Sequence, residues 1–241
     1  EPFQSNWVPV GNGAQLTMMC AVYLEDSPEI GGFYQEPTTT YEQRYKKVRE
    51  RIYKHINATY GNLGMNGEGM DYAEFAGHIL IPTALAMATA GDSSLLDSCK
   101  TRHWWQWIEY AIPSSRKMGA HLQLGVDFGE LMSNGWASLM FSILPQSEIK
   151  PYQHCYDLFA GIHSPLPLTE KFEPNYGGTV WSLIFYPTDN GETYPPTSGQ
   201  MVGDTGHGNF LFRNRWKDST DILFSFNSDN WWNNGIWNQA E

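Results

Sequence analysis

Hydrophobic positions in the first 160 residues recur at the three- and four-residue spacing of α-helices. Residues 14–24 and 72–90 are apolar on most sides, which is typical of helices that their neighbours bury. Residues 39–56 instead interleave Tyr, Val and Ile with six basic residues, as in an outer amphipathic helix. Further helices are predicted over residues 104–112, 130–144 and 151–160. Alternating inner and outer helices indicate antiparallel helical hairpins arranged in a ring or layered array.

The pattern changes near residue 165, where Pro165 and Pro167 interrupt the chain. Three later runs are rich in β-branched and aromatic residues and are bounded by turn residues, which predicts strands. They are TVWSLIFY at 179–186, NFLFRNRW at 209–216 and TDILFSF at 220–226. We therefore expect an α+β protein, with a helical domain over residues 1–164 and the beginning of an antiparallel β domain over residues 165–241.

The predicted β domain looks incomplete, because three or four strands leave long sheet edges without a neighbour. We expect it to continue beyond Glu241. At the other end, Asn6-Trp7 stands with no helix before it. Both features lead us to expect that the chain is one piece of a longer polypeptide, whose remainder would be its partner.

Composition and charge narrow the classes of ligand. A net charge of −11 argues against non-specific nucleic-acid binding, which needs a basic surface. Aromatic residues make up 15% of the chain, which suits either a ligand on which rings can stack or a large aromatic core. No run of 18 apolar residues occurs, so no membrane-spanning helix is predicted. Cys20, Cys99 and Cys155 have neither the spacing of a disulfide framework nor that of a metal site.

The most informative motif is Glu68-Gly69-x-x-Tyr72, in which a glycine turn precedes a long apolar helix. Asp71 and Glu74 have the spacing of a capping box, so we predict that this helix begins with Tyr72 in its first turn. Free amide groups and the helix dipole favour negative charge there, which would ease ionisation of the phenol. From spacing alone, the alternative is a half-buried packing tyrosine with a hydrogen-bonded hydroxyl.

Several motifs follow one another in an order that resembles a known enzyme family. SNW at 5–7 comes first, then EGxxY at 68–72, LFRNRW at 211–216, DILFSF at 221–226 and a Gly/Asn/Trp-rich loop. This order resembles the heparinase II/III-like polysaccharide lyases, which include alginate- and ulvan-cleaving enzymes. The resemblance implies an (α/α) toroid followed by an antiparallel β-sandwich, with an anionic polysaccharide in the cleft between them. It also implies a periplasmic or secreted enzyme.

Such lyases break the bond at O4 of a uronic acid by β-elimination, and the resemblance assigns the catalytic roles. Asn6 would neutralise the uronate carboxylate while charge develops at C5, although an asparagine here could instead cap a turn. Tyr72 would take the C5 proton and could return it to O4. The sequence departs from the family at histidine, because Ser5 stands where one is expected before Asn6. The β-domain histidine is expected beyond Glu241, and His207 is the best local substitute.

Other residues are candidates for holding the saccharide. Arg213 and Arg215 alternate along a predicted strand and would share a face. They would bind carboxylate or sulfate if that face lines the cleft, and would be ordinary charges if it faces solvent. Glu68 is expected to shape the turn or orient Tyr72. Candidate platforms for stacking on sugar rings are Trp7, Trp104, Trp105 and the pair Trp231 and Trp232, which we expect to be the most exposed.

Two other functions fit the same sequence features. A glycoside hydrolase on a helical toroid would need two carboxylates flanking the bond, which Glu68 with Asp127 or Glu130 could supply. A non-catalytic saccharide-binding protein would keep the cleft without the chemistry. No cofactor is predicted, and a structural divalent metal in the β domain stays open.

Overall fold

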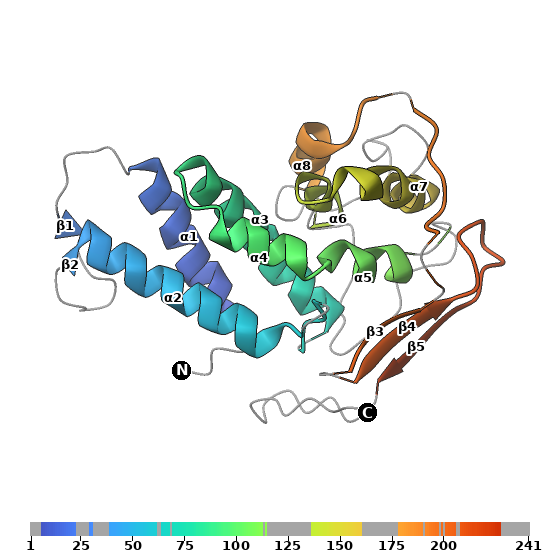
Figure 1. The fold of residues 1–241 in the computed structure, drawn as a ribbon, viewed down its shortest axis with the longest axis horizontal. Coiled ribbons are helices and arrows are strands. Elements are labelled where there is room, and N and C mark those ends of the chain that lie inside the picture. Colours follow the sequence, from blue (N-terminus) through green and yellow to red (C-terminus); the bar gives the residue numbers. More distant parts are fainter. Residues whose placement is uncertain are drawn as a thin grey trace.

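The computed structural model places two antiparallel sheets beside a set of α-helices (Figure 1). It describes residues 6–22, 29–30, 39–61, 64–67, 69–112, 114, 136–160, 178–189, 191–197, 199, 201–205 and 208–227. Eight α-helices lie in this part of the chain. The predicted α+β class is confirmed, whereas the division into domains at residue 165 stays a prediction.

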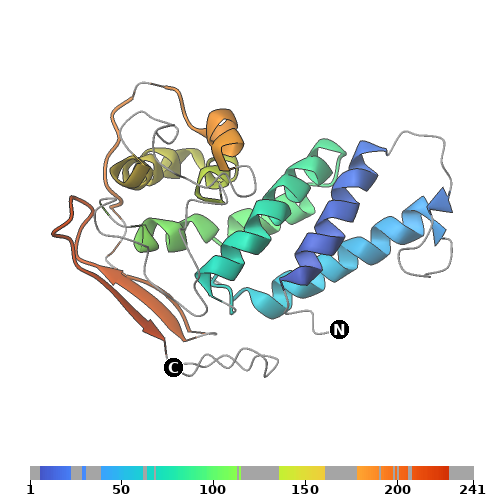
Figure 2. The same cartoon turned by 180° about the vertical axis from the view of Figure 1, so that it is seen from behind.

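Three long helices form one end of the molecule: α1 (Trp7–Ala21), α2 (Tyr41–Thr59) and α3 (Met70–Thr89). Helix α1 packs against both α2 and α3, and it lies in front of α2 in the view of Figure 2. The short strands β1 (Glu29–Ile30) and β2 (Thr39–Thr40) pair antiparallel just before α2.

Side-chain contacts fix the directions of these helices. Gly13 of α1 packs on α3, where an added Cβ would lie 2.6 Å from Ile79 Cγ2. Thr17, one turn further on, lies 3.0 Å from the hydroxyl of Thr83. Contacts that advance together along both helices mean that α1 and α3 run parallel. Tyr41 donates to the carbonyl of Met19, while Arg44, further along α2, donates to Gln15, so α2 runs antiparallel to α1.

The starts of α2 and α3 differ. Thr40 and Gln43 form a reciprocal capping box at α2. Helix α3 starts after Gly69, whose φ of 100° is readily adopted only by glycine, and it has no side-chain cap. The predicted capping box of Asp71 and Glu74 is therefore wrong. The prediction that Tyr72 lies in the first turn of α3 is confirmed.

Shorter helices connect this part to the sheet. Helix α4 (Ser94–Thr101) packs on α3, and α5 (Trp104–Ala111) leads towards the sheet. The remaining elements are α6 (Trp136–Leu139), two 3₁₀ turns, η2 (Met140–Ser142) and η3 (Gln146–Glu148), α7 (Ile149–Ala160) and α8 (Gly178–Phe185). None of the helices in the described ranges is both long and apolar enough to span a membrane.

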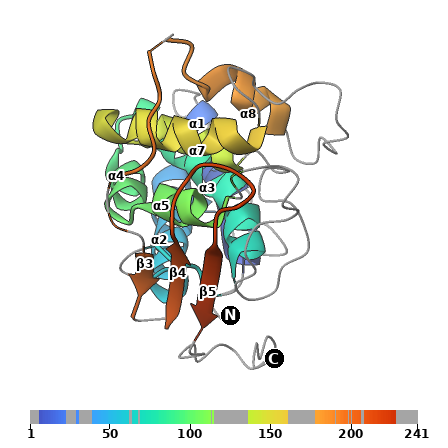
Figure 3. The ribbon, with the colours of Figure 1, turned by 90° about the vertical axis from the view of Figure 1, so that its right-hand side faces the viewer.

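The larger sheet has the order β3-β4-β5 and is antiparallel throughout (Figure 3). Its strands are β3 (Met201–Asp204), β4 (Asn209–Arg213) and β5 (Leu223–Asn227). The inner face packs on α5 and buries Val202, Leu211 and Arg213. The outer face is also apolar, but it is largely exposed at Met201, Ile222, Phe224 and Phe226.

Two predictions about individual elements are wrong. Residues 179–186, predicted as a strand, form helix α8, because an apolar run this short fits either structure and packing decides between them. Ser182 of α8 is fully buried and lies 3.1 Å from the hydroxyl of Tyr156. Helix α1 is not buried all round, since α2 and α3 cover only one side of it. Trp7 is 71% exposed and Met18 is 65% exposed.

Candidate functional site

The N-terminal ends of α1 and α3 meet at one corner of the helical layer (Figure 2). The rings of Trp7 and Phe75 lie edge to face there, with centroids 6.2 Å apart. This contact brings Asn6-Trp7 beside the first turns of the helix that carries Tyr72. The structure thus places two of the predicted site residues, Asn6 and Trp7, beside the start of the helix that carries a third, Tyr72.

Asn6 immediately precedes α1, and its side chain is 5% exposed. It occupies the N-cap position with a helical backbone conformation, yet its side chain makes no capping hydrogen bond. The backbone carbonyl of Asn6 accepts the first helical bond, from Val10 N at 3.5 Å. The amide group of Asn6 therefore does not cap α1, while the alternative that it caps a turn stays a prediction.

Tyr72 is the third residue of α3 and is partly exposed. One turn later, Phe75 contacts both Trp7 and the ring of His78, whose centroid is 5.4 Å away. His78 is buried, and burial lowers the pKa of its imidazole, while weaker effects of hydrogen bonding to the backbone of Glu74 and Phe75 raise it. This histidine is therefore neutral at neutral pH and belongs to the core side of α3.

The described residues of the loop that connects α2 to α3 (the 60–69 loop) are 60–61, 64–67 and 69. Backbone hydrogen bonds link them, from Gly61 N to Met65 O and from Gly67 N to Thr59 O, each 2.9 Å long. A further bond from Gly69 to Asn66 reaches the residue that precedes α3. The position at which α3 begins, and with it the position of Tyr72, is set by the conformation of this loop.

The sheet contacts the same loop through Asp204, the last residue of β3. Asp204 is 2% exposed, and its carboxylate lies so close to Gly61 that a Cβ there would overlap it. In the β3–β4 hairpin, Asp204 pairs with Asn209, and the connection between them includes position 207. Neither Asp204 nor Gly61 was predicted as a site residue, because the amino acids around Asp204 in the sequence indicate only a turn.

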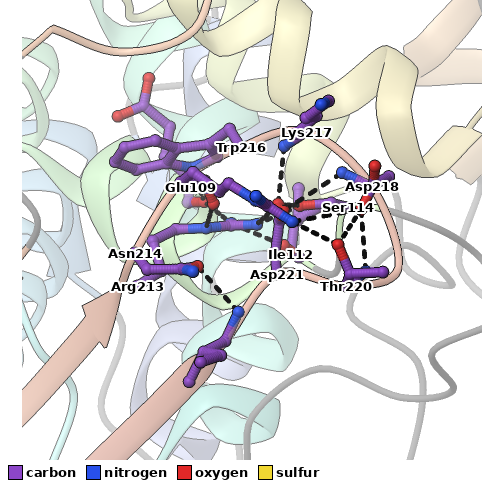
Figure 4. Close-up of polar contacts among 12 residues, drawn as sticks. Glu109, Ile112, Ser114, Arg213, Asn214, Trp216, Lys217, Asp218, Thr220 and Asp221 are labelled. Atoms are coloured by element: carbon purple, nitrogen blue, oxygen red, sulfur yellow. Dashed lines mark hydrogen bonds and ion pairs between the residues drawn. The ribbon is translucent and has the colours of Figure 1, made fainter.

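Arg213 lies at the end of β4 with its side chain fully buried (Figure 4). Its Nη1 donates to the carbonyls of Glu109 and Ile112, both at 2.8 Å, and its Nε donates to Arg215 O at 3.0 Å. Its Nη2 donates to Ser114 and lies 3.7 Å from Asp221. All of these partners belong to the protein, and the guanidinium is buried. Arg213 therefore faces neither a cleft nor solvent, although the sequence predicted one or the other.

Arg215 lies beyond the end of the strand, and its side chain is 44% exposed. Its Nε donates to Asp221 Oδ1 at 2.8 Å. Burial opposes ionisation of Asp221, but hydrogen bonds from Ser114, Lys217 and Arg215 outweigh it and lower the pKa of this carboxyl. The two arginines share a carboxylate partner, although they do not share an open face.

Other predicted site residues are either buried or outside the described part of the chain. Trp104 and Trp105 are 1% and 2% exposed, so both belong to the core and cannot stack on a sugar. The residues that lie outside the described part of the chain are Glu68, Asp127, Glu130, His207, Trp231 and Trp232. Within the described ranges, no group of three or more His, Cys, Asp or Glu side chains could hold a metal ion.

Comparison of the chain with known protein families, with curated protein sequences and with solved structures finds no match in any of the three.

Proposed function

We propose that this protein is a polysaccharide lyase that cleaves a uronic-acid-containing anionic polysaccharide by β-elimination. The observation that carries the proposal is the contact between Trp7 and Phe75, which brings Asn6 and Tyr72 to one corner. An amide donor, a partly exposed phenol and an exposed indole are the groups that such a reaction needs from the protein.

In the proposed reaction, the amide of Asn6 donates to the C6 carboxylate of a uronate residue. This reduces the repulsion between the carboxylate and the charge that develops at C5. The phenolate of Tyr72 takes the C5 proton, and the electron pair of that bond forms a double bond between C4 and C5. The bond from C4 to O4 breaks, and O4 leaves with a proton from Tyr72 or from the proposed acid, His207.

The directions of the helices support binding of an anion at this corner. Helices α1 and α3 run parallel and are 15 and 20 residues long, so the positive ends of both dipoles meet there. No acidic side chain occupies the first turn of α1. A substrate carboxylate and a phenolate are both stabilised at helix N-termini, typically by about 0.3–1 kcal/mol for an exposed charge.

Exposure of Trp7 supports binding of a sugar. An indole that is 71% exposed offers an apolar face on which the C–H side of a pyranose can stack. The ring of Phe75 packs against the indole at a centroid distance of 6.2 Å, so the indole has fewer orientations to lose on binding. Trp7 is therefore the proposed platform beside the reacting uronate.

The architecture proposed for the whole protein is an (α/α) toroid followed by a β-sandwich. The antiparallel pair α1/α2, followed by α3 that runs parallel to α1 and packs beside it, supports the toroid. A sheet with apolar residues on both faces supports the sandwich, because a second sheet would cover Phe224 and Phe226. A periplasmic or secreted location is part of the same proposal.

The test is incubation with a panel of polyuronates, namely alginate, ulvan, heparan sulfate and chondroitin sulfate. A lyase product carries a new double bond and absorbs in the near ultraviolet. We expect this absorbance from the wild-type protein, its loss in Tyr72→Phe and a large decrease in Asn6→Ala. Tyr194→Phe is the matched control, because Tyr194 is 47% exposed and distant in sequence from the site.

Three outcomes contradict the proposal in different ways. New reducing ends without ultraviolet absorbance would identify a hydrolase. Oligosaccharide binding without turnover would identify a binding protein. Undiminished absorbance in Tyr72→Phe would leave a lyase in which Tyr72 is not the base.

A further inference from the structure

The loop between α2 and α3 is held from two sides by segments that are distant in sequence. On one side, the Asp204 carboxylate at the end of β3 lies against Gly61. On the other side, the carbonyl of Arg102 and the ring of Trp104 lie against Gly64, whose φ is +82°. Neither glycine has space for a Cβ, so the loop fits only one arrangement of these neighbours.

The Asp204 contact is built into the core. Asp204 is 2% exposed, and its negative charge raises the pKa of Arg102, although burial of that guanidinium lowers it by more. Arg102 in turn donates from Nη2 to Asn57 Oδ1 of α2 at 2.8 Å. A buried carboxylate of this kind is costly to place unless neighbouring groups compensate its charge, so its position is well defined.

Backbone hydrogen bonds connect Gly61, which Asp204 contacts, to the start of α3. Gly64 N donates to Gly61 O at 2.9 Å, and Tyr60 pairs with Asn66 across the loop. Asn66 O accepts from Gly69 N at 3.1 Å, and Gly69 O accepts from Ala73 N at 3.0 Å. Among the described residues of the loop, this short chain of bonds connects Gly61 to the first turn of α3, in which Tyr72 lies.

We propose that Asp204 is a positioning residue for Tyr72: it holds the 60–69 loop and thereby sets where α3 begins. Asp204 does not touch the substrate. It acts through Gly61, from the β-sheet side of the molecule, on a residue of the helical side. This inference rests on the proposed lyase function for its effect on turnover, while its effect on the first turn of α3 can be measured without activity.

The first experiment is hydrogen exchange of the full chain, with the hydrogen-bonded amides of Gly69 and Ala73 as the readout and those of α4 as the internal reference. We expect Asp204→Ala to speed exchange of the Gly69 and Ala73 amides by about 10-fold or more relative to α4. Asp204→Asn keeps the shape of the side chain and should restore slow exchange. Asp189→Ala, at an exposed aspartate paired with Lys150, is the control and should change neither segment.

The second experiment measures turnover of whichever polyuronate the wild-type protein cleaves. We expect Asp204→Ala to lower kcat by about 10–100-fold, with KM changed less than about 2-fold, because a misplaced base slows chemistry more than binding. Asp204→Asn should recover most of kcat. Gly61→Ala should lower kcat similarly, because the added Cβ would displace the Asp204 carboxylate. The double variant Gly61→Ala/Asp204→Ala should be no worse than either single variant, because both changes disrupt the same contact.

The outcomes separate the two proposals. If the wild-type protein makes no unsaturated product, the lyase function fails, and the exchange experiment alone decides the role of Asp204. Exchange that rises equally in α4 and at the amides of Gly69 and Ala73 would overturn the positioning role and leave Asp204 as a general stabiliser. Additive effects of Gly61→Ala and Asp204→Ala would also overturn it.

Discussion

Arg213, at the end of β4, donates from Nη1 to the carbonyl oxygen of Ile112 at 2.8 Å. Ile112 directly follows α5, so a fully buried guanidinium satisfies a carbonyl that the helix end leaves without an intrahelical partner. Trp216 adds a second donor, from Nε1 to Glu109 O at 3.0 Å. The sheet is therefore attached to α5 by polar groups at the end of the helix as well as by the apolar residues of its inner face.

Replacement of Arg213 by alanine should strongly destabilise the protein. It would leave the carbonyls of Glu109 and Ile112 and the carboxylate of Asp221 without a buried cation, which typically costs about 3–5 kcal/mol. Urea unfolding followed by tryptophan fluorescence measures the loss. Arg215→Ala is the matched control, because Arg215 also binds Asp221 but is 44% exposed, and it should cost about 1 kcal/mol or less. Equal losses would contradict a special role for the buried guanidinium.

Glu109 should make the protein less stable as the pH rises. Its side chain is 1% exposed, and burial, together with the charge of Glu148, raises the pKa of its carboxyl well above the usual value. The folded state keeps this proton above about pH 4.3, where a glutamate in the unfolded chain loses it, so stability falls with rising pH. Glu109→Gln removes the effect. Its advantage in unfolding free energy over the wild type should be absent near pH 4 and should grow towards about pH 8.

Asp221→Asn supplies a control of opposite sign for the same pH series. The pKa of Asp221 is lowered in the folded state, so its stabilisation is present above about pH 3.9 and is lost as the pH falls. The variant should be less stable than the wild type at neutral pH, and the difference should close in acid. A difference that stays constant with pH in either variant would show that titration of that carboxyl is not responsible.

Two tryptophans should respond in opposite ways to truncation. Trp7→Ala should leave the unfolding free energy nearly unchanged but weaken binding of polyuronate oligosaccharides by roughly 10-fold, because the ring is largely exposed at the proposed site. Trp104→Ala should instead cost about 3–5 kcal/mol of stability, because this ring is buried and stacks on Tyr60 at 4.7 Å. Calorimetry with oligosaccharides, alongside urea unfolding, measures both. Unchanged affinity in Trp7→Ala would remove Trp7 from the site.

Two helical glycines should also differ. A Cβ at Gly77 of α3 would overlap the indole of Trp136 in α6, so Gly77→Ala should destabilise by about 1–3 kcal/mol. Gly11→Ala, on the exposed side of α1, meets no atom within 4 Å and should stabilise by about 0.5–1 kcal/mol through lower chain entropy. Thermal unfolding of both variants measures the two changes. Stabilisation by Gly77→Ala would mean that α3 and α6 are not in close contact.

Local patterns were sufficient to predict most of the helices and two of the strands. The spacing of apolar residues predicted α2, α3 and α5 to within a few residues, because each buries one stripe of its own sequence. It predicted β4 and β5 for the same reason. It gave no signal for the short elements α4 and β3, whose few apolar residues do not establish a period. It also gave the wrong structure for α8, because an apolar run of eight residues fits both the period of a helix and that of a strand.

The candidate site was predictable only in part. The prediction that Tyr72 lies in the first turn of α3 is confirmed, although the Asp71–Glu74 capping box from which it was made is wrong. The sequence could not show that Gly69, rather than an Asp71–Glu74 box, starts the helix, because a positive φ leaves no mark beyond the glycine itself. Nor could it show that Arg213 is buried, because alternation along a strand indicates which residues share a face but not what covers that face.

The sequence by itself determined the helical periods, the aromatic and acidic composition, and the position of Tyr72 on its helix. Only the tertiary structure decided that Trp7 meets Phe75, that Asp204 lies on Gly61 and that Arg213 binds the end of α5. The physical reason is the range of the interactions. Helical period and turn chemistry depend on residues a few positions apart, whereas these contacts join residues brought together only when separate elements bury their faces against one another.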